Sequence, residues 1–171
     1  STPIYKEIMA YSGRYKVRDF KKYEGDPDKV VYRSSWEKAC FIWCDSNPDI
    51  VKWSSEEIVV PYKWDIDKKM HRYFVDLKVT FKNKKTLLIE IKPDKETSPP
   101  KRPDKTKRYI NEAMTYVKNM NKWEAANNFA KDRGWEFQIW TEDTLHSMGI
   151  MKKLKGLKPL KPYRKKSKKK V

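Results

Sequence analysis

The chain has 171 residues, with 40 Lys and Arg against 23 Asp and Glu, which gives a formal net charge of +17. Hydrophobic residues make up 38% of it and include 7 Trp, 10 Tyr and 6 Phe, enough for the core of one domain of moderate size. The charge favours a polyanionic partner, nucleic acid ahead of an acidic membrane surface. No apolar run approaches the roughly 18 residues of a spanning helix, and residues 1–15 lack the apolar centre of a signal peptide, so we expect neither.

Local signals in the first half of the chain predict one helix followed by strands. Residues 1–33 read as irregular, and residues 34–49 read as a helix that Ser34 caps and Asn47-Pro48 ends. We then expect two short strands within 49–64, a turn at 65–70, one strand at 71–81, a hairpin turn at 82–85 and a strand at 86–92.

The second half is predicted to be mostly helical. A Pro- and Lys-rich loop covers 93–107, and two helices follow at 107–120 and 121–134, the second stopped by Gly134. A strand at 135–140 and a short capped helix within 141–151 complete the pattern. We therefore expect an α/β domain over 1–151, a mixed sheet flanked by helices, and a flexible basic tail over 152–171.

The predicted hairpin places two acids and a lysine close together. Side chains alternate faces along a strand, so Glu90 and Lys92 share a face, and the turn at 82–85 sets Asp76 opposite position 90 or 91. Two carboxylates this close repel each other unless a cation lies between them, and Mg²⁺ accepts few protein carboxylates. A lysine beside such a site can stabilise charge on a scissile phosphate. The alternative is an ordinary solvated sheet face, on which acid–lysine pairs are common.

Glu37 is the candidate for a third acid, and it has two interpretations. Ser34-Ser35-Trp36-Glu37 matches the S-x-x-E capping box, so Glu37 either caps its own helix or joins the site. We predict that Cys40 and Cys44 are small buried side chains, not metal ligands or a redox pair. We predict that the seven tryptophans mainly pack in the core and do not stack on nucleobases.

Five segments together resemble a known family: YRSSWEKACFIWCD, VVPYKW, RYFVDLKVTF, LLIEIKP and FQIWTED. Over residues 10–150 the chain resembles the PD-(D/E)xK nuclease superfamily. Within it the similarity is greatest to TnsA-type transposon endonucleases and to head completion nucleases of large contractile-tailed phages. Val75 stands where the superfamily's name has Pro, which weakens the motif more than the chemistry.

The resemblance implies a restriction-endonuclease-like fold and a metal-dependent DNA endonuclease. It implies that Asp76, Glu90 and the main-chain carbonyl of Ile91 bind Mg²⁺, with Mn²⁺ able to substitute. It gives Glu37 a supporting or second-metal role and Lys92 a catalytic one.

The resemblance also implies a setting: a head completion protein acting on packaged DNA ends, with portal or neck proteins as partners and no membrane. Its location would be the host-cell cytoplasm or the virion. The alternative function is a non-catalytic nucleic-acid-binding assembly protein that keeps a nuclease-like fold.

Two basic clusters are candidates for DNA contact. One follows the proposed site, where the alternative is a solvated loop; it comprises Lys101, Arg102, Lys105, Lys107 and Arg108. The other is the tail, with eleven Lys and Arg and no acid from residue 152 onward, where the alternative is a solubilising role. Its leading candidates are Lys152, Lys153, Lys155, Arg164, Lys165 and Lys166.

Overall fold

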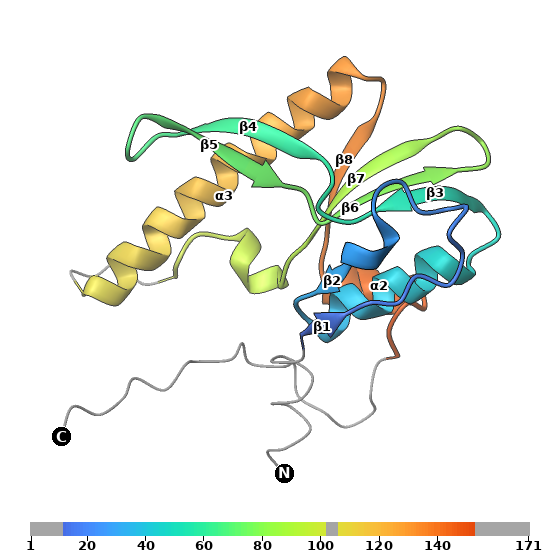
Figure 1. Ribbon diagram of the computed structural model, residues 1–171. Coiled ribbons are helices and arrows are strands. Elements are labelled where there is room, and N and C mark those ends of the chain that lie inside the picture. The colour runs from blue at the N-terminus through green and yellow to red at the C-terminus, as the bar shows by residue number, and fades with distance from the viewer. Residues whose placement is uncertain (1–11, 102–105, 153–171) are drawn as a thin grey trace, which may run out of the picture.

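A four-stranded mixed sheet lies at the centre of the computed structural model, which describes residues 12–101 and 106–152 (Figure 1). The strand order is β3 (Ile50–Ser54), β6 (Leu77–Phe81), β7 (Thr86–Ile91) and β8 (Glu136–Trp140). The β3–β6 and β6–β7 pairs are antiparallel, and β7–β8 is parallel. This confirms the predicted α/β architecture with a mixed sheet flanked by helices.

Each face of the sheet is covered by a helix, because β7 is apolar on both sides. Leu87 and Ile89 pack in a core cluster with α2 (Ser35–Ser46), whereas Leu88 packs in a second cluster with α3 (Lys107–Asp132). Strand β7 is therefore buried on both faces, and Glu90 lies at its end, where the two layers meet.

A second, two-stranded ribbon lies over α3, formed by β4 (Val59–Trp64) and β5 (Lys69–Phe74) (Figure 1). The prediction of one strand over 71–81 is wrong, because β5 and β6 belong to different sheets. Val75 packs in the α3 cluster and Leu77 in the α2 cluster, on opposite faces of the central sheet. A regular strand would put these two residues on one face, so the chain must bend at Asp76.

The bend is shared with the partner strand. The Val75 N–H donates to the Ile58 carbonyl, and the Val75 carbonyl accepts from the Glu56 N–H. Glu56 has a φ of 55°, a left-handed conformation that reverses the chain between β3 and β4. The segment between β3 and β4 and the segment between β5 and β6 therefore pass side by side from the central sheet to the ribbon.

The prediction of two helices over 107–134 is also wrong, because α3 is continuous. No Gly or Pro occurs between Lys107 and Asp132, and Asn residues near the middle lower helix propensity without ending the helix. The predicted stop is confirmed: Gly134 follows the C-cap Arg133 with a φ of 72°. The C-terminal half packs on the ribbon and sheet, while Ile110 and Met120 are exposed.

The remaining elements are short. Residues 13–33, predicted as irregular, contain the paired β1 (Gly13–Arg14) and β2 (Val31–Tyr32) and the 3₁₀ turn η1 (Pro27–Lys29). After β7 come the 3₁₀ turn η2 (Asp94–Thr97) and, at the end, α4 (Glu142–Ser147), whose Thr141 closes a capping box as predicted for this segment.

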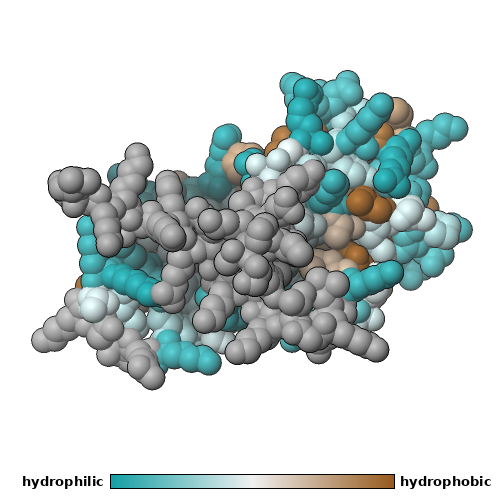
Figure 2. All heavy atoms as spheres, turned by 90° about the horizontal axis from the view of Figure 1, so that it is seen from below, coloured by the Kyte–Doolittle hydropathy of each residue, from teal (hydrophilic) through white to brown (hydrophobic). Residues whose placement is uncertain are grey.

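Cysteine and tryptophan take their ordinary roles. Cys40 and Cys44 are buried free thiols in the α2 cluster. None of the seven tryptophans is exposed, which confirms core packing. Seen from below, the described surface is mainly hydrophilic, with a small apolar patch (Figure 2). Among the described residues, no helix combines the length and apolarity needed to cross a membrane.

Candidate active site

The end of β7 carries a buried carboxylate next to a lysine. Glu90 is only 6% exposed, and its Oε1 lies 3.3 Å from the Nζ of Lys92. The Lys92 N–H donates to the Trp140 carbonyl at 3.0 Å, which continues the parallel pairing with β8. Lys92 is therefore held at the sheet edge, with its side chain turned back toward Glu90.

Asp76 reaches the same place from the bend between β5 and β6. The β6–β7 register pairs Leu77 with Ile89, so Asp76 stands opposite Glu90, one residue beyond the paired strands. Its Oδ2 accepts a hydrogen bond from the Ile91 N–H at 2.8 Å. The structure thus brings Asp76, Glu90 and Lys92 together, as strand alternation and turn length led us to expect.

Two residues at this site were missed from the sequence. The Tyr73 hydroxyl donates a hydrogen bond to Glu90 Oε2, and the Nζ of Lys122 lies 5.4 Å from the centre of the Tyr73 ring. Alternation within β5 could have placed Tyr73 on the buried face. No local pattern links Lys122 to Lys92, because α3 packs over the ribbon only in the folded chain.

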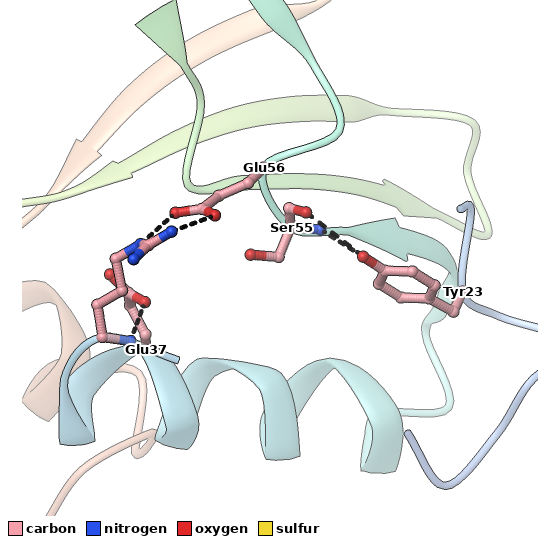
Figure 3. A network of polar contacts seen from close by, with 5 residues as sticks. Tyr23, Glu37, Ser55 and Glu56 are labelled. Carbon is pink, nitrogen blue, oxygen red and sulfur yellow. Dashed lines mark hydrogen bonds and ion pairs between the residues drawn. The ribbon is translucent and has the colours of Figure 1, made fainter. Parts of the chain in front are cut away.

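Glu37 both caps α2 and contributes to the charge of the site. The Ser34 Oγ accepts from the Glu37 N–H at 3.2 Å, and Glu37 Oε2 accepts from the Arg33 N–H at 2.7 Å. Arg33 in turn donates two hydrogen bonds to Glu56, at 2.8 and 3.1 Å (Figure 3). The predicted capping box is thus half formed, because Glu37 accepts from the Arg33 N–H and not from that of the N-cap Ser34. The role of Glu37 in catalysis stays a prediction.

The turn that carries Glu56 is fixed from the other side by Tyr23. The Tyr23 hydroxyl accepts from the Ser55 N–H at 3.3 Å and lies 3.4 Å from the Ser55 carbonyl, to which it donates (Figure 3). The anchored turn therefore holds Glu56 against Arg33, at the N-terminus of α2. No local sequence pattern predicts this network.

The site concentrates negative charge in a place poor in water. Burial raises the pKa of Asp76 well above its ordinary value, and the nearby Glu90 and Glu37 carboxylates raise it further; the Ile91 N–H and Lys92 oppose them. Burial also raises the pKa of Glu37, with added repulsion from Glu56 and Glu90. Burial lowers the pKa of Lys122, against the attraction of Glu90. A cation between Asp76 and Glu90 would remove most of this repulsion.

The donor set suits a hard cation that keeps water ligands. Two carboxylates, Asp76 and Glu90, meet beside the main chain of Ile91, and Mg²⁺ commonly takes one or two protein carboxylates. Within residues 12–101 and 106–152, no group of three or more His, Cys, Asp or Glu side chains is arranged to hold a metal. The site therefore fits an ion held by two acids, not a closed structural metal centre.

The candidate DNA-binding residues fall partly outside the described chain. Lys101, Lys107, Arg108 and Lys152 are exposed, and Arg108 pairs with Glu112 at 3.0 Å. The other candidates lie outside the described residues: Arg102, Lys105, Lys153, Lys155, Arg164, Lys165 and Lys166. The division into a domain over 1–151 and a tail over 152–171 likewise stays a prediction.

Comparison with known proteins places the chain in a family. The model for the N-terminal domain of TnsA-like endonucleases matches residues 47–142. The chain belongs to the TnsA-like endonuclease family. It is also 44% identical over 147 residues to the head completion nuclease of Enterobacteria phage T4, across 83% of this chain and 98% of that protein. The similarity to TnsA-type endonucleases and the similarity to head completion nucleases, both inferred from the sequence, are thereby confirmed.

The matched region contains three of the four candidate catalytic residues. Asp76, Glu90 and Lys92 all lie within residues 47–142, whereas Glu37 lies before them. The bend at Asp76 and the end of β7 are thus parts of the TnsA-like domain itself.

Proposed function

We propose that this protein is a Mg²⁺-dependent endonuclease that hydrolyses phosphodiester bonds in DNA. The observation that carries the proposal is the meeting of Asp76, Glu90 and Lys92 at the end of β7, one buried and one half-buried carboxylate beside an ammonium group. Family membership supports the endonuclease class, and the net charge of +17 supports a polyanionic substrate.

The protein's own groups have distinct parts in the proposed reaction. Asp76 and Glu90, with the Ile91 carbonyl, would hold the divalent ion, and Mn²⁺ would substitute for Mg²⁺. When bound there, the ion supplies Lewis-acid activation of the scissile phosphate. Tyr73 fixes the orientation of Glu90 through its hydrogen bond, and Ile91 fixes Asp76 through its N–H.

Lys92 is the proposed catalytic cation. Its side chain is 22% exposed, so it can meet a phosphate from solvent while its Nζ stays 3.3 Å from Glu90. A positive charge fixed at this point stabilises the negative charge that gathers on the phosphate oxygens as the bond breaks. Glu37 has a supporting role, because its carboxylate adds to the field at Asp76.

The relative's name supports a proposal for the biological setting. Because the phage T4 protein is named a head completion nuclease, we place this chain at the ends of packaged DNA, with portal or neck proteins as partners. Its location would then be the host-cell cytoplasm and, after assembly, the virion.

The test is cleavage of plasmid and branched DNA with Mg²⁺, with Mn²⁺ or with EDTA. We expect cleavage with either metal, none with EDTA, and a loss of at least about 100-fold for Asp76→Ala and Lys92→Met. Lys131→Met is the matched control, since Lys131 is an exposed lysine at the far end of α3.

Two results would contradict the proposal. Full cleavage by Asp76→Ala would show that the metal is not held where we place it. DNA binding without cleavage under any divalent metal would instead favour the non-catalytic assembly protein.

A further inference from the structure

A groove of about 690 Å³ lies between the N-terminal half of α3 and the segment that follows β7. One wall is the chain from η2 to Lys101, which leaves β7 directly after Lys92. The other wall is α3, from Arg108 to Asn119. The lining of the groove therefore begins three residues after the proposed catalytic lysine, at Lys95.

The floor of the groove carries an unused amide. Asn119 is 7% exposed and lines the groove, yet its side chain makes no hydrogen bond with any residue in the described part of the chain. Its amide atoms are not among the fully buried, unpartnered polar atoms of the described residues, so the amide is open to the groove. An amide that both donates and accepts is suited to the polar edge of a nucleobase.

The rest of the lining matches one nucleotide. The Tyr116 ring and Pro100 offer apolar surface for the face of a base, and Lys95 and Lys101 supply cations for a phosphate. Two acids, Glu96 and Glu112, also line the groove, but Glu112 is paired with Arg108 at 3.0 Å. A volume of about 690 Å³ is that of a small-ligand cleft, too small for a duplex.

A half-buried lysine lies one turn of α3 further along, on the way to the acids. The Nζ of Lys122 lies over the rings of Tyr62 and Tyr73, at 5.9 and 5.4 Å, and no carboxylate of the described residues lies within the 4.0 Å of an ion pair. Because the Tyr73 hydroxyl is bonded to Glu90, this cation is linked to the candidate active site through the Tyr73 side chain. A phosphate would add a direct ion-pair partner to the longer-range attraction of Glu90.

From these contacts we infer that the groove binds an unpaired nucleotide of the DNA strand next to the cut, with Asn119 on the base and Lys122 on a phosphate. The enzyme thereby selects DNA that has a single-stranded tail or branch beside the duplex. This inference rests on the proposed function, because the tail is useful only if the scissile phosphate lies at Lys92.

The experiment measures binding, without cleavage, in EDTA. Full-length protein is titrated against labelled duplexes of equal length that are blunt or carry a short 3′ or 5′ single-stranded tail. We expect wild type to bind one tailed duplex more tightly than the blunt one by about fivefold or more, the scale of one stacked base.

Three variants locate the preference. Thr115→Trp fills the groove from an exposed position, and Asn119→Leu removes the amide while keeping its size; each should abolish the preference and leave blunt-duplex affinity unchanged. Asn128→Leu, on an exposed part of α3 outside the groove, should keep the preference. Thermal melting checks that Asn119→Leu is folded, and Thr115→Trp gives the answer independently if it is not.

The outcomes separate this inference from the proposed function. Equal wild-type affinity for blunt and tailed DNA, or a preference that survives Thr115→Trp, overturns the groove assignment even if the protein cleaves DNA. A tail preference lost in Thr115→Trp supports the groove, even if no metal restores cleavage. Binding of a peptide, but not of tailed DNA, would overturn it in favour of a protein partner.

Discussion

At the scale of residues, the site is built from groups that oppose folding. Glu90 lies buried at the end of the apolar strand β7, and Asp76 lies half-buried in the bend before β6. Each carboxylate is held by a specific donor, the Ile91 N–H for Asp76 and the Tyr73 hydroxyl for Glu90. Such an arrangement lowers the stability of the metal-free chain and prepares a place for a cation.

The raised pKa of Asp76 predicts a pH dependence of stability. Since the folded state favours the protonated acid, the free energy of unfolding falls as pH rises from the ordinary Asp pKa, about 4, through the raised folded value. Asp76→Asn keeps an acceptor for the Ile91 N–H but carries no charge. In EDTA its melting temperature should exceed that of wild type at pH 7, and the gap should close toward pH 4.

The control is Asp132→Asn, at an exposed position at the end of α3, which should change the melting temperature little at either pH. Adding Mg²⁺ should raise the melting temperature of wild type and not that of Asp76→Asn, because ligands stabilise only the state that binds them. Parallel melting curves across this pH range would contradict the placement of a buried acid at position 76.

At the scale of elements, the continuity of α3 decides what meets the active site. Only an unbroken helix can carry Trp123, Ala126 and Ala130 into the core while presenting Asn119 to the groove and Lys122 to Tyr73. The bend between β5 and β6 has the same importance, because it turns Asp76 out of the paired strands and toward Ile91.

The continuity of α3 can be tested at Met120, an exposed residue near its middle. Met120→Pro should lower the free energy of unfolding by about 3 kcal/mol or more, because it removes a helical hydrogen bond and clashes with the preceding turn. Met120→Ala should change it by less than about 0.5 kcal/mol. Urea unfolding measures both. If a helix ended at 120 and another began there, proline would be tolerated.

At the scale of the whole molecule, we expect the net charge to set the affinity for DNA and the candidate active site to set the chemistry. Residues 152–171 hold eleven of the 40 Lys and Arg, and residues 1–151 keep a net charge of +6 without them. We therefore expect the tail to add affinity for any DNA, and the residues at the end of β7 to determine what happens to the bound strand.

Deleting residues 152–171 should weaken DNA binding and flatten its dependence on salt, because fewer counterions are released on binding. Cleavage at saturating DNA should stay near wild type, since the deletion leaves β7 and the bend at Asp76 intact. Affinity measured from low to physiological salt checks this, with a tail of equal length and no net charge as the control. An unchanged salt slope would favour the solubilising interpretation.

The sequence by itself determined the pieces that depend on near neighbours. Alternation along 86–92 put Glu90 beside Lys92, the short turn at 82–85 set Asp76 across from Glu90, and Ser34 marked the start of α2. Only the tertiary structure decided that Tyr73 and Lys122 join the site, that the strand breaks at Asp76, and that a groove lies along α3. The physical reason is range: turn chemistry and strand alternation act within a few residues, whereas the choice of which face packs on which helix is settled by burial across the whole chain.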